Sequence, residues 1–524
     1  MGVRLSGLLD VGLGLRPDGL ALVAPGREWS WRGLEVASGR YAQHLLAVGV
    51  RRGDRVASLM PEGDALVVHY LACFRAGLVA TPLNFRYTPP EIDHALRVSG
   101  ARLLLVDAGR LDDVAASRLA GRLPLGLVVH GGGDDGVRFE DLLEESAVSV
   151  PLEVGGPAEA AAIFFTSGST GPAKGVTHSV RSLEAVVALW GEAYEFGPGD
   201  VVGMFASLSH IGGFGDLFSG LSRGAKAVIP ERHDVECQLS LIRTHRPTYG
   251  VFMSSNLFSL VRDDRTEVGD FSSFRVLGAA GDKVPAALQA ELSALGGPLL
   301  NEAYGMTEIG NATLSPLDVE PTAGSVGRPA AGYEMEIRDK AGSPVPLGTS
   351  GRLWVRSKAV MSGYWNEPEG TSAVLVGGWF DTGDVFTQDE DGYLWFQGRE
   401  KQIIVHNGSN ISPQEVEDAL VQHPAVLQAG VVGVPDTVHG ENVRAFIELK
   451  PGATTPDAEE LIAFARTRVG YKAPKDIIIV DALPLSPSGK IDRTELKRIS
   501  GRIPADFVSR FTKSGRAVIF GLLI

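Results

Sequence analysis

The sequence is short of cysteine and of long apolar runs. Two cysteines in 524 residues, Cys73 and Cys237, give no disulfide framework. Both fall in patterns typical of helices, so we interpret them as buried free thiols in a reducing, cytoplasmic compartment. No stretch reaches the roughly 20 apolar residues of a membrane helix, and we expect neither a signal peptide nor a membrane partner.

Positive charge is also scarce. The chain carries 49 Lys and Arg against 63 Asp and Glu, a formal net charge of −14. A general nucleic-acid binder needs clustered basic residues, and so does a protein drawn to anionic membranes, so both classes are disfavoured. A small anionic ligand needs only a few well-placed donors and stays compatible with this charge.

The sequence does contain the alternation of short apolar strands and amphipathic helices that is typical of an α/β protein. Residues 55–60, 102–106 and 161–165 are short apolar runs that predict strands, while 67–78 and 180–194 predict helices. This alternation continues to about residue 310 and favours layered α/β subdomains. From 332 to 396 short strands separated by Gly and Pro predict a mainly β subdomain.

A further α+β unit begins near residue 400. The pattern predicts helices at 413–422 and 457–469 and strands at 429–434, 443–449 and 476–480. The unit has just over 100 residues and is large enough to fold alone. The apolar run 517–524 has no assigned purpose: packing on the body, contact with a partner and a frayed end all stay open.

The strongest local signal is a loop rich in glycine, hydroxyl groups and one lysine. Glycines let the backbone approach an anion closely, hydroxyls add donors without bulk, and a lysine supplies a point charge suited to phosphate. The loop follows a strand and leads towards a helix, as expected of a phosphate cradle, and it lacks the spacing of a Walker loop. A flexible surface turn is the alternative. The predicted ligands are Thr166, Ser167, Gly168, Ser169, Thr170, Gly171 and Lys174.

This loop resembles the phosphate loop of the adenylate-forming superfamily, which includes acyl-CoA synthetases, peptide-synthetase adenylation domains and firefly luciferase. Further signatures of that family follow in order along nearly the whole chain. The resemblance implies that ATP activates a carboxylic acid to an acyl-AMP with release of pyrophosphate, and that the acyl group then passes to the thiol of coenzyme A. It also implies an N-terminal domain at 1–398, with a β-rich subdomain at about 325–398, and a mobile C-terminal lid at 399–524.

The resemblance assigns the adenylate site residue by residue. Tyr304 would stack on adenine, Thr307 would contact phosphate and Glu308 would bind Mg²⁺, for which a carboxylate is a suitable hard ligand. Asp384 would accept hydrogen bonds from both ribose hydroxyls, and Arg399 would bind ribose or phosphate. The same segments add Gly305, Met306, Ala280 and Gly281.

Three positions in the C-terminal unit resemble its moving parts in the family. Lys490 would bridge the substrate carboxylate and the α-phosphate, where negative charge builds in the transition state. Lys401 stands at the hinge position, although Gln402 follows it where many acyl-CoA synthetases have Asp. Gly408 lies in the loop that would approach the pantetheine arm of coenzyme A.

The acid pocket is predicted to be apolar. His210 matches the position near the acyl carboxylate and counts among the catalytic candidates, with Lys490, Thr307 and Glu308. Amino-acid-activating members carry an Asp immediately after this position, and Ile211 stands there in this chain, which indicates a non-amino acid. The rest of the predicted lining is Met253, Ser254, Gly278 and Ala279.

Alternatives remain for the acceptor and for catalysis itself. Transfer to a carrier protein acting in trans, or to a partner enzyme, would stop this chain at acyl-AMP. A non-catalytic nucleotide-binding module is a second alternative, and nothing positively indicates a luciferase-type oxygenation. A homodimer would be in keeping with the family. The identity of the acid stays open.

Overall fold

The computed structural model describes residues 2–132, 137–144, 152–166, 173–280, 286–317, 319–322, 324–406, 409–436, 439–486, 490–502 and 518–520. By compactness the chain divides into two units. The first comprises Met1–Val284, Leu288–Met335 and Val355–Asp381, and the second comprises Pro285–Ala287, Glu336–Trp354 and Thr382–Ile524. Both mix helices and sheets, which confirms the expected α/β class.

The first sheet of unit 1 has eight strands in the order β21-β9-β8-β4-β3-β5-β6-β7. Neighbouring strands from β8 through β4, β3, β5 and β6 to β7 run parallel, and the β8–β9 and β9–β21 pairs at the other end are antiparallel. Helices α4 (Pro89–Ser99) and α5 (Leu111–Ala116) contribute to one core with these strands. Helix α3 (Asp64–Arg75) packs against β4 and α2 (Trp31–Ala47). The strands are β3 Arg55–Leu59, β4 Val79–Pro82, β5 Leu103–Asp107, β6 Leu127–His130, β7 Val137–Arg138, β8 Ala160–Thr166, β9 Lys174–Ser179 and β21 Gly363–Tyr364.

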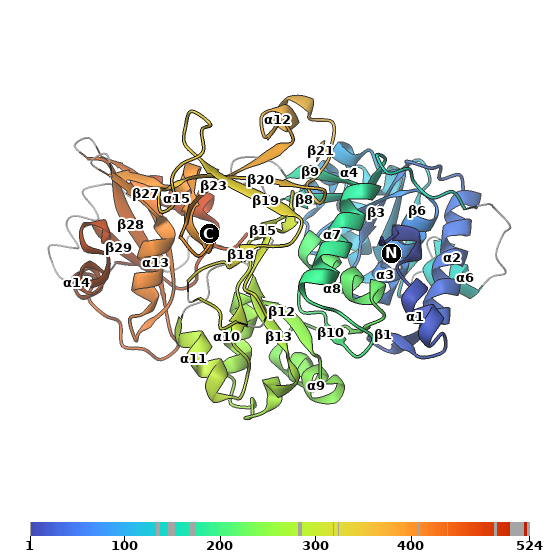
Figure 1. The fold of residues 1–524 in the computed structure, drawn as a ribbon, viewed down its shortest axis with the longest axis horizontal. Helices are drawn as coiled ribbons and strands as arrows, with labels where there is room; N and C mark the ends of the chain where they lie inside the picture. The colour runs from blue at the N-terminus through green and yellow to red at the C-terminus, as the bar shows by residue number, and fades with distance from the viewer. Residues whose placement is uncertain are drawn as a thin grey trace. The chain divides into compact units, whose positions relative to one another are not determined.

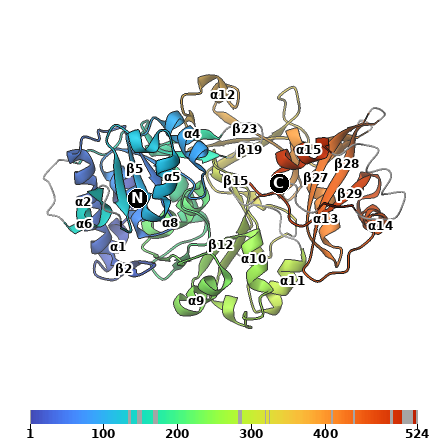
Figure 2. The same ribbon diagram turned by 180° about the vertical axis from the view of Figure 1, so that it is seen from behind.

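The second sheet of unit 1 has seven strands in the order β14-β13-β12-β10-β11-β1-β2, parallel except for the β1–β2 pair. Helices α9 (Val235–His245), α10 (Ser254–Val261) and α11 (Ala286–Ala294) surround β12 and β13 (Figures 1 and 2). The strands are β1 Leu20–Ala24, β2 Arg27–Ser30, β10 Val201–Gly203, β11 Lys226–Val228, β12 Tyr249–Met253, β13 Val276–Ala280 and β14 Leu300–Asn301.

Helix α8 (Ile211–Ser222) joins the two sheets, and every residue except Gly212 is buried. Its Phe214 ring lies 5.7 Å from that of Phe164 in β8. On the other side, Asp216 accepts a hydrogen bond of 2.6 Å from the hydroxyl of Tyr249 in β12. Helix α7 (Val180–Ala193) packs closely alongside, because a Cβ on Gly215 would overlap the Trp190 ring. The start of α8 is therefore fixed relative to both sheets.

The buried Asp216 makes the stability of unit 1 depend on pH. Burial raises its pKa from 3.8 to about 7, while the pKa of Tyr249 is raised far above neutrality. Between about pH 4 and pH 7 the folded chain keeps this proton and the unfolded chain has lost it, so the free energy of unfolding falls as pH rises. Above pH 7 the loss in free energy of unfolding that Asp216 causes is complete, and it is on the order of 4 kcal/mol.

We therefore expect Asp216→Asn to stabilise the protein at pH 8 and to flatten this part of the pH profile, because an amide oxygen still accepts from Tyr249 without carrying charge. The measurement is the free energy of unfolding in urea at pH 5 and at pH 8, for the wild-type protein and the variant. Asp112→Asn, at an exposed position on α5, is the matched control. An unchanged pH slope in Asp216→Asn would contradict the assignment.

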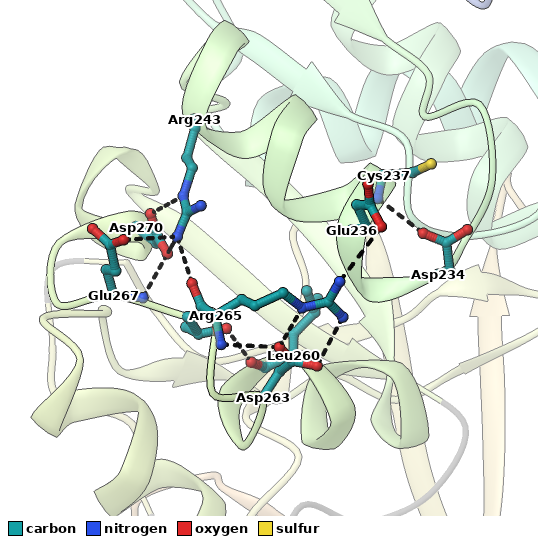
Figure 3. A network of polar contacts seen from close by, with 10 residues as sticks. Asp234, Glu236, Cys237, Arg243, Leu260, Asp263, Arg265, Glu267 and Asp270 are labelled. Atoms are coloured by element: carbon teal, nitrogen blue, oxygen red, sulfur yellow. Dashed lines mark hydrogen bonds and ion pairs between the residues drawn. The ribbon is translucent and has the colours of Figure 1, made fainter.

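Ion pairs connect α9 to the segment that follows α10 (Figure 3). The Arg243 guanidinium donates to both carboxylate oxygens of Asp270, at 2.8 and 2.9 Å, and the backbone of Glu267 donates to the same carboxylate. The hydrogen bonds from Arg243 lower the pKa of Asp270. Arg265 pairs with Asp263 beside them. These contacts hold the connection between β12 and β13 against α9.

Unit 2 contains a six-stranded sheet with the path β26-β25-β28-β29-β30 and β27 paired to β28. Helices α13 (Pro413–Val421) and α14 (Ala458–Val469) cover one face, and α15 (Arg493–Arg502) covers the other (Figures 1 and 2). Alternating residues of β27 serve the two cores, Val431 on the first face and Val432 on the second. The strands are β25 Ile404–His406, β26 Ser409–Ile411, β27 Val426–Asp436, β28 Gly440–Leu449, β29 Asp476–Val480 and β30 Val518–Phe520.

A separate five-stranded sheet follows the order β19-β20-β23-β22, with β24 paired to β23, and its β22–β23 and β23–β24 pairs are antiparallel. It confirms the short strands expected between 332 and 396. Among the residues that the structure describes, no helix combines the length and apolar character needed to cross a bilayer. The strands are β19 Tyr333–Arg338, β20 Gly351–Ser357, β22 Leu375–Val376, β23 Trp379–Gln388 and β24 Leu394–Arg399.

Candidate active site

The candidate residues of unit 1 gather where parallel strands end. Strands β10, β12, β13 and β14 are neighbours in the second sheet, so their carboxyl ends meet at one edge. In open α/β sheets ligands bind at that edge. The segment with His210 follows β10, Met253 ends β12, Ala280 ends β13, and Tyr304 follows β14. Candidates that are distant in sequence thus share one edge.

Predicted acyl-pocket residues at the end of β12 contact Ala280 of β13, which was predicted for the adenylate site. Met253 and Ala280 are partners in the parallel register, and the Ser254 hydroxyl donates to the carbonyl of Ala280 at 3.1 Å. Gly278 pairs with Val251 and Asn301, and a Cβ on it would lie 3.3 Å from the Asn301 carbonyl. Small residues therefore keep β13 close to its neighbours. Ala279 lies between Gly278 and Ala280 on β13, and Gly281 lies outside the described residues.

His210 is the N-cap residue of α8, and Ile211 behind it is buried. The imidazole Nε2 lies 3.3 Å from the amide nitrogen of Asn84, and the backbone N–H of His210 donates to Ser207. The Ser207 hydroxyl in turn donates to the Glu62 carboxylate. Burial opposes ionisation of Glu62, but hydrogen bonds from His233 and Ser207 outweigh it and lower its pKa. The loop that carries His210 is thus held by a carboxylate that sequence reasoning missed.

The segment Tyr304–Glu308 forms a tight hairpin of β15 (Gly305–Met306) and β16 (Gly310–Asn311). Only glycine fits at position 305, because a Cβ there would lie 2.4 Å from the Gly310 carbonyl. The backbone of Tyr304 donates to the Thr313 hydroxyl, and its own phenol contacts the Met306 sulfur at 3.7 Å. Thr307 and Glu308 therefore stand at the turn of a rigid hairpin.

A buried histidine that the sequence analysis did not select fixes this turn. His178 Nε2 lies 2.8 Å from the carbonyl oxygen of Thr307. A carbonyl only accepts, so the Nε2 proton donates to it. Burial lowers the pKa of His178 to about 4, so the imidazole is neutral at pH 7. These two residues stand 129 positions apart in sequence, and a single sequence carries no signal of their contact.

The phosphate loop departs from one expectation. It was expected to lead towards a helix, but β9 comes first, and α7 begins only at Val180. Thr166 and Lys174 are register partners across the antiparallel β8–β9 pair. The β-branched Val176 and Thr177 favour the extended strand. The predicted ligands Ser167, Gly168, Ser169, Thr170 and Gly171 lie outside the described residues.

Lys174 and Glu308 meet the same aromatic residue. The Tyr364 hydroxyl donates to Glu308 Oε1 at 3.0 Å, and the Lys174 ammonium lies 4.5 Å from the centre of the Tyr364 ring. Lys174 also lies 3.4 Å from the carboxylate of Glu367. Glu308 is 6% exposed. Sequence analysis selected the lysine and the buried glutamate but not the tyrosine between them.

Glu308 has the chemistry of a Mg²⁺ ligand. Among the described residues, no group of three or more His, Cys, Asp and Glu side chains could hold a metal. Mg²⁺ is commonly bound through one or two carboxylates together with substrate phosphates. A single carboxylate beside a phosphate loop therefore fits a magnesium ion that arrives with a nucleotide.

Unit 2 brings two of its candidates together. Asp384 and Arg399 are register partners on β23 and β24, and the Arg399 Nε lies 3.5 Å from the Asp384 carboxylate. Asp384 is 4% exposed, and its backbone N–H donates to Thr382. The pair offers a guanidinium and a carboxylate side by side, as expected for a ligand rich in hydroxyl groups.

The other candidates of unit 2 lie on its surface. Lys401 is exposed in the short 3₁₀ turn η5 (Glu400–Gln402). Lys490 is exposed, its neighbour Ile491 forms a β-bridge with Leu485, and the backbone N–H of Ser486 donates to the Lys490 carbonyl at 2.7 Å. Gly408 lies outside the described residues. Because both lysine side chains are exposed, each could contact a ligand without first leaving a buried position.

Comparison with known proteins matches the chain over most of its length. The sequence profile of the AMP-binding enzyme family matches residues 13–365, and that of the AMP-binding enzyme C-terminal domain matches residues 415–490. A feruloyl-CoA synthase of Amycolatopsis sp is 35% identical over 93% of this chain and 97% of its own length. An indoleacetate–CoA ligase of Aromatoleum aromaticum is 32% identical over 95% and 99%. The anthranilate CoA ligase AuaEII, solved with anthranoyl-AMP, aligns with TM-score 0.89 at 28% identity, covering 95% of this chain and 98% of its own.

Proposed function

Because the chain belongs to the AMP-binding enzyme family, as an AMP-forming acid–thiol ligase, we propose that its substrate is an aromatic carboxylic acid. The observation that carries the proposal is the edge at β12 and β13, where Gly278, Ala279 and Ala280 present little side chain beside Met253. A flat ring fits beside such a strip. Relatives named for feruloyl, indoleacetate and anthranilate chemistry support an aromatic acid.

The acid is activated with ATP and then joined to coenzyme A. The carboxylate attacks the α-phosphate, pyrophosphate leaves, and the resulting mixed anhydride acylates a thiol while AMP leaves. A carboxylate is a poor acylating agent and a mixed anhydride is a good one, so ATP supplies the activation. The protein contributes by positioning the reactants and stabilising charge.

For the first step we assign roles to the unit 1 candidates. Lys174 and the phosphate loop would bind the β- and γ-phosphates, and Thr307 would contact the α-phosphate. Glu308 would hold Mg²⁺, which neutralises the polyphosphate when bound. Tyr304 would cover the adenine. The rigid hairpin and the His178 hydrogen bond to Thr307 support this assignment, because they hold the contact atoms still.

For the acid we assign His210 to the carboxylate end. Its contact with Asn84 limits the rotation of the imidazole. Ile211 is buried and apolar, so no carboxylate stands there to pair an α-amine. This supports an acid without an amino group at that position.

The second unit supplies the remaining roles. Asp384 and Arg399 would bind the ribose, and Lys490 would neutralise charge during adenylation. We propose domain boundaries at 398 and 399, with a hinge at Lys401 and Gly408 near the incoming thiol. Two free cysteines support a reducing, cytoplasmic location, where ATP and coenzyme A are available. A homodimer stays a prediction.

The experiment is pyrophosphate release from Mg·ATP over a panel of hydroxycinnamic, indole, benzoic and fatty acids, with and without coenzyme A, and with thioester detected by mass. We expect thioester from an aromatic acid and at least tenfold lower kcat/KM with fatty acids of C12 to C16, a ratio that reflects about 1.4 kcal/mol or more. Preference for the fatty acids would overturn the aromatic assignment. Acyl-AMP without thioester would favour a carrier protein or partner enzyme as acceptor, and no turnover would favour the nucleotide-binding module.

A further inference from the structure

A short segment of unit 1, residues 361–367, is fastened to the strand that carries Lys174. Gly363 and Tyr364 of β21 pair with Thr177 and Val176 of β9. The backbone N–H of Ser362 donates to Thr177 at 2.8 Å, and that of Trp365 donates to Gly175 at 2.7 Å. The backbone of Tyr364 is thus held by hydrogen bonds on both sides, close to the end of the phosphate loop.

The same segment holds Glu308 twice. The Met361 N–H donates to the Glu308 carbonyl at 2.7 Å, and the Tyr364 hydroxyl donates to Glu308 Oε1 at 3.0 Å. A carboxylate only accepts hydrogen bonds, so the Tyr364 hydroxyl is the donor of this contact. A hydrogen bond to one oxygen of a buried carboxylate restricts its rotation and orients the group.

The ring of Tyr364 faces the lysine. The Lys174 ammonium lies 4.5 Å from the ring centre, within the range of a cation–π contact. Its ion pair with Glu367 is weak, because both side chains are about 40% exposed, at 42% and 41%. A phosphate can therefore displace Glu367, while the ring continues to guide the ammonium.

We propose that Tyr364 is a positioning residue for adenylation, which holds the metal-binding carboxylate of Glu308 with its hydroxyl and steers Lys174 with its ring. The inference rests on the proposed roles of Glu308 and Lys174. The Tyr364 side chain then sets the distance between the Mg²⁺ site at Glu308 and the Lys174 ammonium, which would bind the same triphosphate.

The hydroxyl is tested with Tyr364→Phe, which keeps the ring. We expect the Mg²⁺ concentration for half-maximal pyrophosphate release to rise about tenfold or more, the usual cost of losing a partner of a metal ligand, with the KM for the acid unchanged. Binding of α,β-methylene-ATP, titrated by calorimetry over a range of Mg²⁺ concentrations, should show the same rise without any turnover.

Tyr333→Phe is the matched control. The Tyr333 hydroxyl donates to the carbonyl of Ile309 at 2.8 Å, next to Glu308 on the same hairpin, but contacts neither Glu308 nor Lys174 in the described hydrogen bonds. We expect its Mg²⁺ dependence to match wild type. A second variant, Tyr364→Leu, also removes the ring, and it should weaken analogue binding at saturating Mg²⁺, which Tyr364→Phe should not.

The outcomes distinguish the role of Tyr364 from the proposed function of the protein. An equal Mg²⁺ shift in Tyr333→Phe and Tyr364→Phe, or no shift in Tyr364→Phe, overturns the positioning role. Equal analogue binding by Tyr364→Leu and Tyr364→Phe at saturating Mg²⁺ overturns the role of the ring. Absence of pyrophosphate release by the wild-type protein with every acid would instead count against the proposed function, and the calorimetric titration would still decide the role of Tyr364.

Discussion

Replacement of Lys490 by alanine is expected to lower the rate of acyl-AMP formation by on the order of 100- to 1,000-fold, the range found when one preorganised charge-stabilising donor is removed. Negative charge accumulates between the carboxylate and the α-phosphate during the first step, and the ammonium group neutralises it there. Thiol attack on the finished anhydride has no such need, so Lys490→Ala should convert supplied acyl-AMP and coenzyme A to thioester within about threefold of the wild-type rate. Pyrophosphate release and thioester mass, measured separately, check the two halves.

Lys497 provides the control for this prediction. It is an exposed lysine of the same unit, on α15. Lys497→Ala therefore removes one positive charge and leaves the proposed catalytic lysine, Lys490, in place. Both reactions should proceed normally in that variant. Equal losses of adenylation and thioester formation in Lys490→Ala would refute the division of roles.

The second large effect concerns the movement between the two steps. Proline at position 401 fixes the backbone φ angle near −65°, and hinges work by large φ/ψ changes at a few residues. Lys401→Pro should therefore slow thioester formation by on the order of tenfold or more while adenylation stays within about threefold of wild type. The observable is the ratio of thioester to pyrophosphate in one time course.

Lys401→Ala separates charge from backbone freedom. It removes the ammonium but keeps the torsion, so thioester formation should be close to wild type. If Lys401→Pro forms thioester at the normal rate, the hinge does not lie at this residue. If Lys401→Ala is as slow as Lys401→Pro, the lysine side chain rather than the hinge is responsible.

Local pattern was enough to predict many of the elements that build the site. The apolar run 161–165 lies within β8, the run 476–480 coincides with β29, and the amphipathic pattern from 180 became α7. In each case side chains alternate or recur along a few consecutive residues, so the information is contained in the segment itself. The roles of the glycine-rich loop and of the Tyr304–Glu308 segment came instead from resemblance to family motifs, and they stay predictions.

Strand β9 was missed because its pattern is ambiguous. Gly175 and His178 weaken an apolar alternation, and the neighbouring loop and helix gave stronger signals. In the fold this strand is completed by partners on both sides, β8 and β21, which are far from each other in sequence. Tertiary context therefore decided a segment that propensity left open.

Long-range polar contacts could not be predicted. Tyr364 reaches Glu308 across 56 positions, and Asn84 reaches His210 across 126. Both pairs depend on which strand edges the fold places together. Each of these residues is an unremarkable tyrosine or asparagine in the sequence, because nothing local distinguishes a side chain that orients a carboxylate from one that faces water.

The close packing of α8 has a consequence for redesigning the substrate range. A Cβ on Gly213 would lie 2.3 Å from the Ser207 carbonyl, and one on Gly220 would lie 2.5 Å from the Val202 side chain. Larger residues at these positions would strain β10 and the loop that follows it before they reshaped a pocket. The ends of β12 and β13 carry no such double constraint at Met253, which is partly exposed. A library for new acids is best concentrated at Met253 and its strand neighbours, with the helix left as an invariant frame.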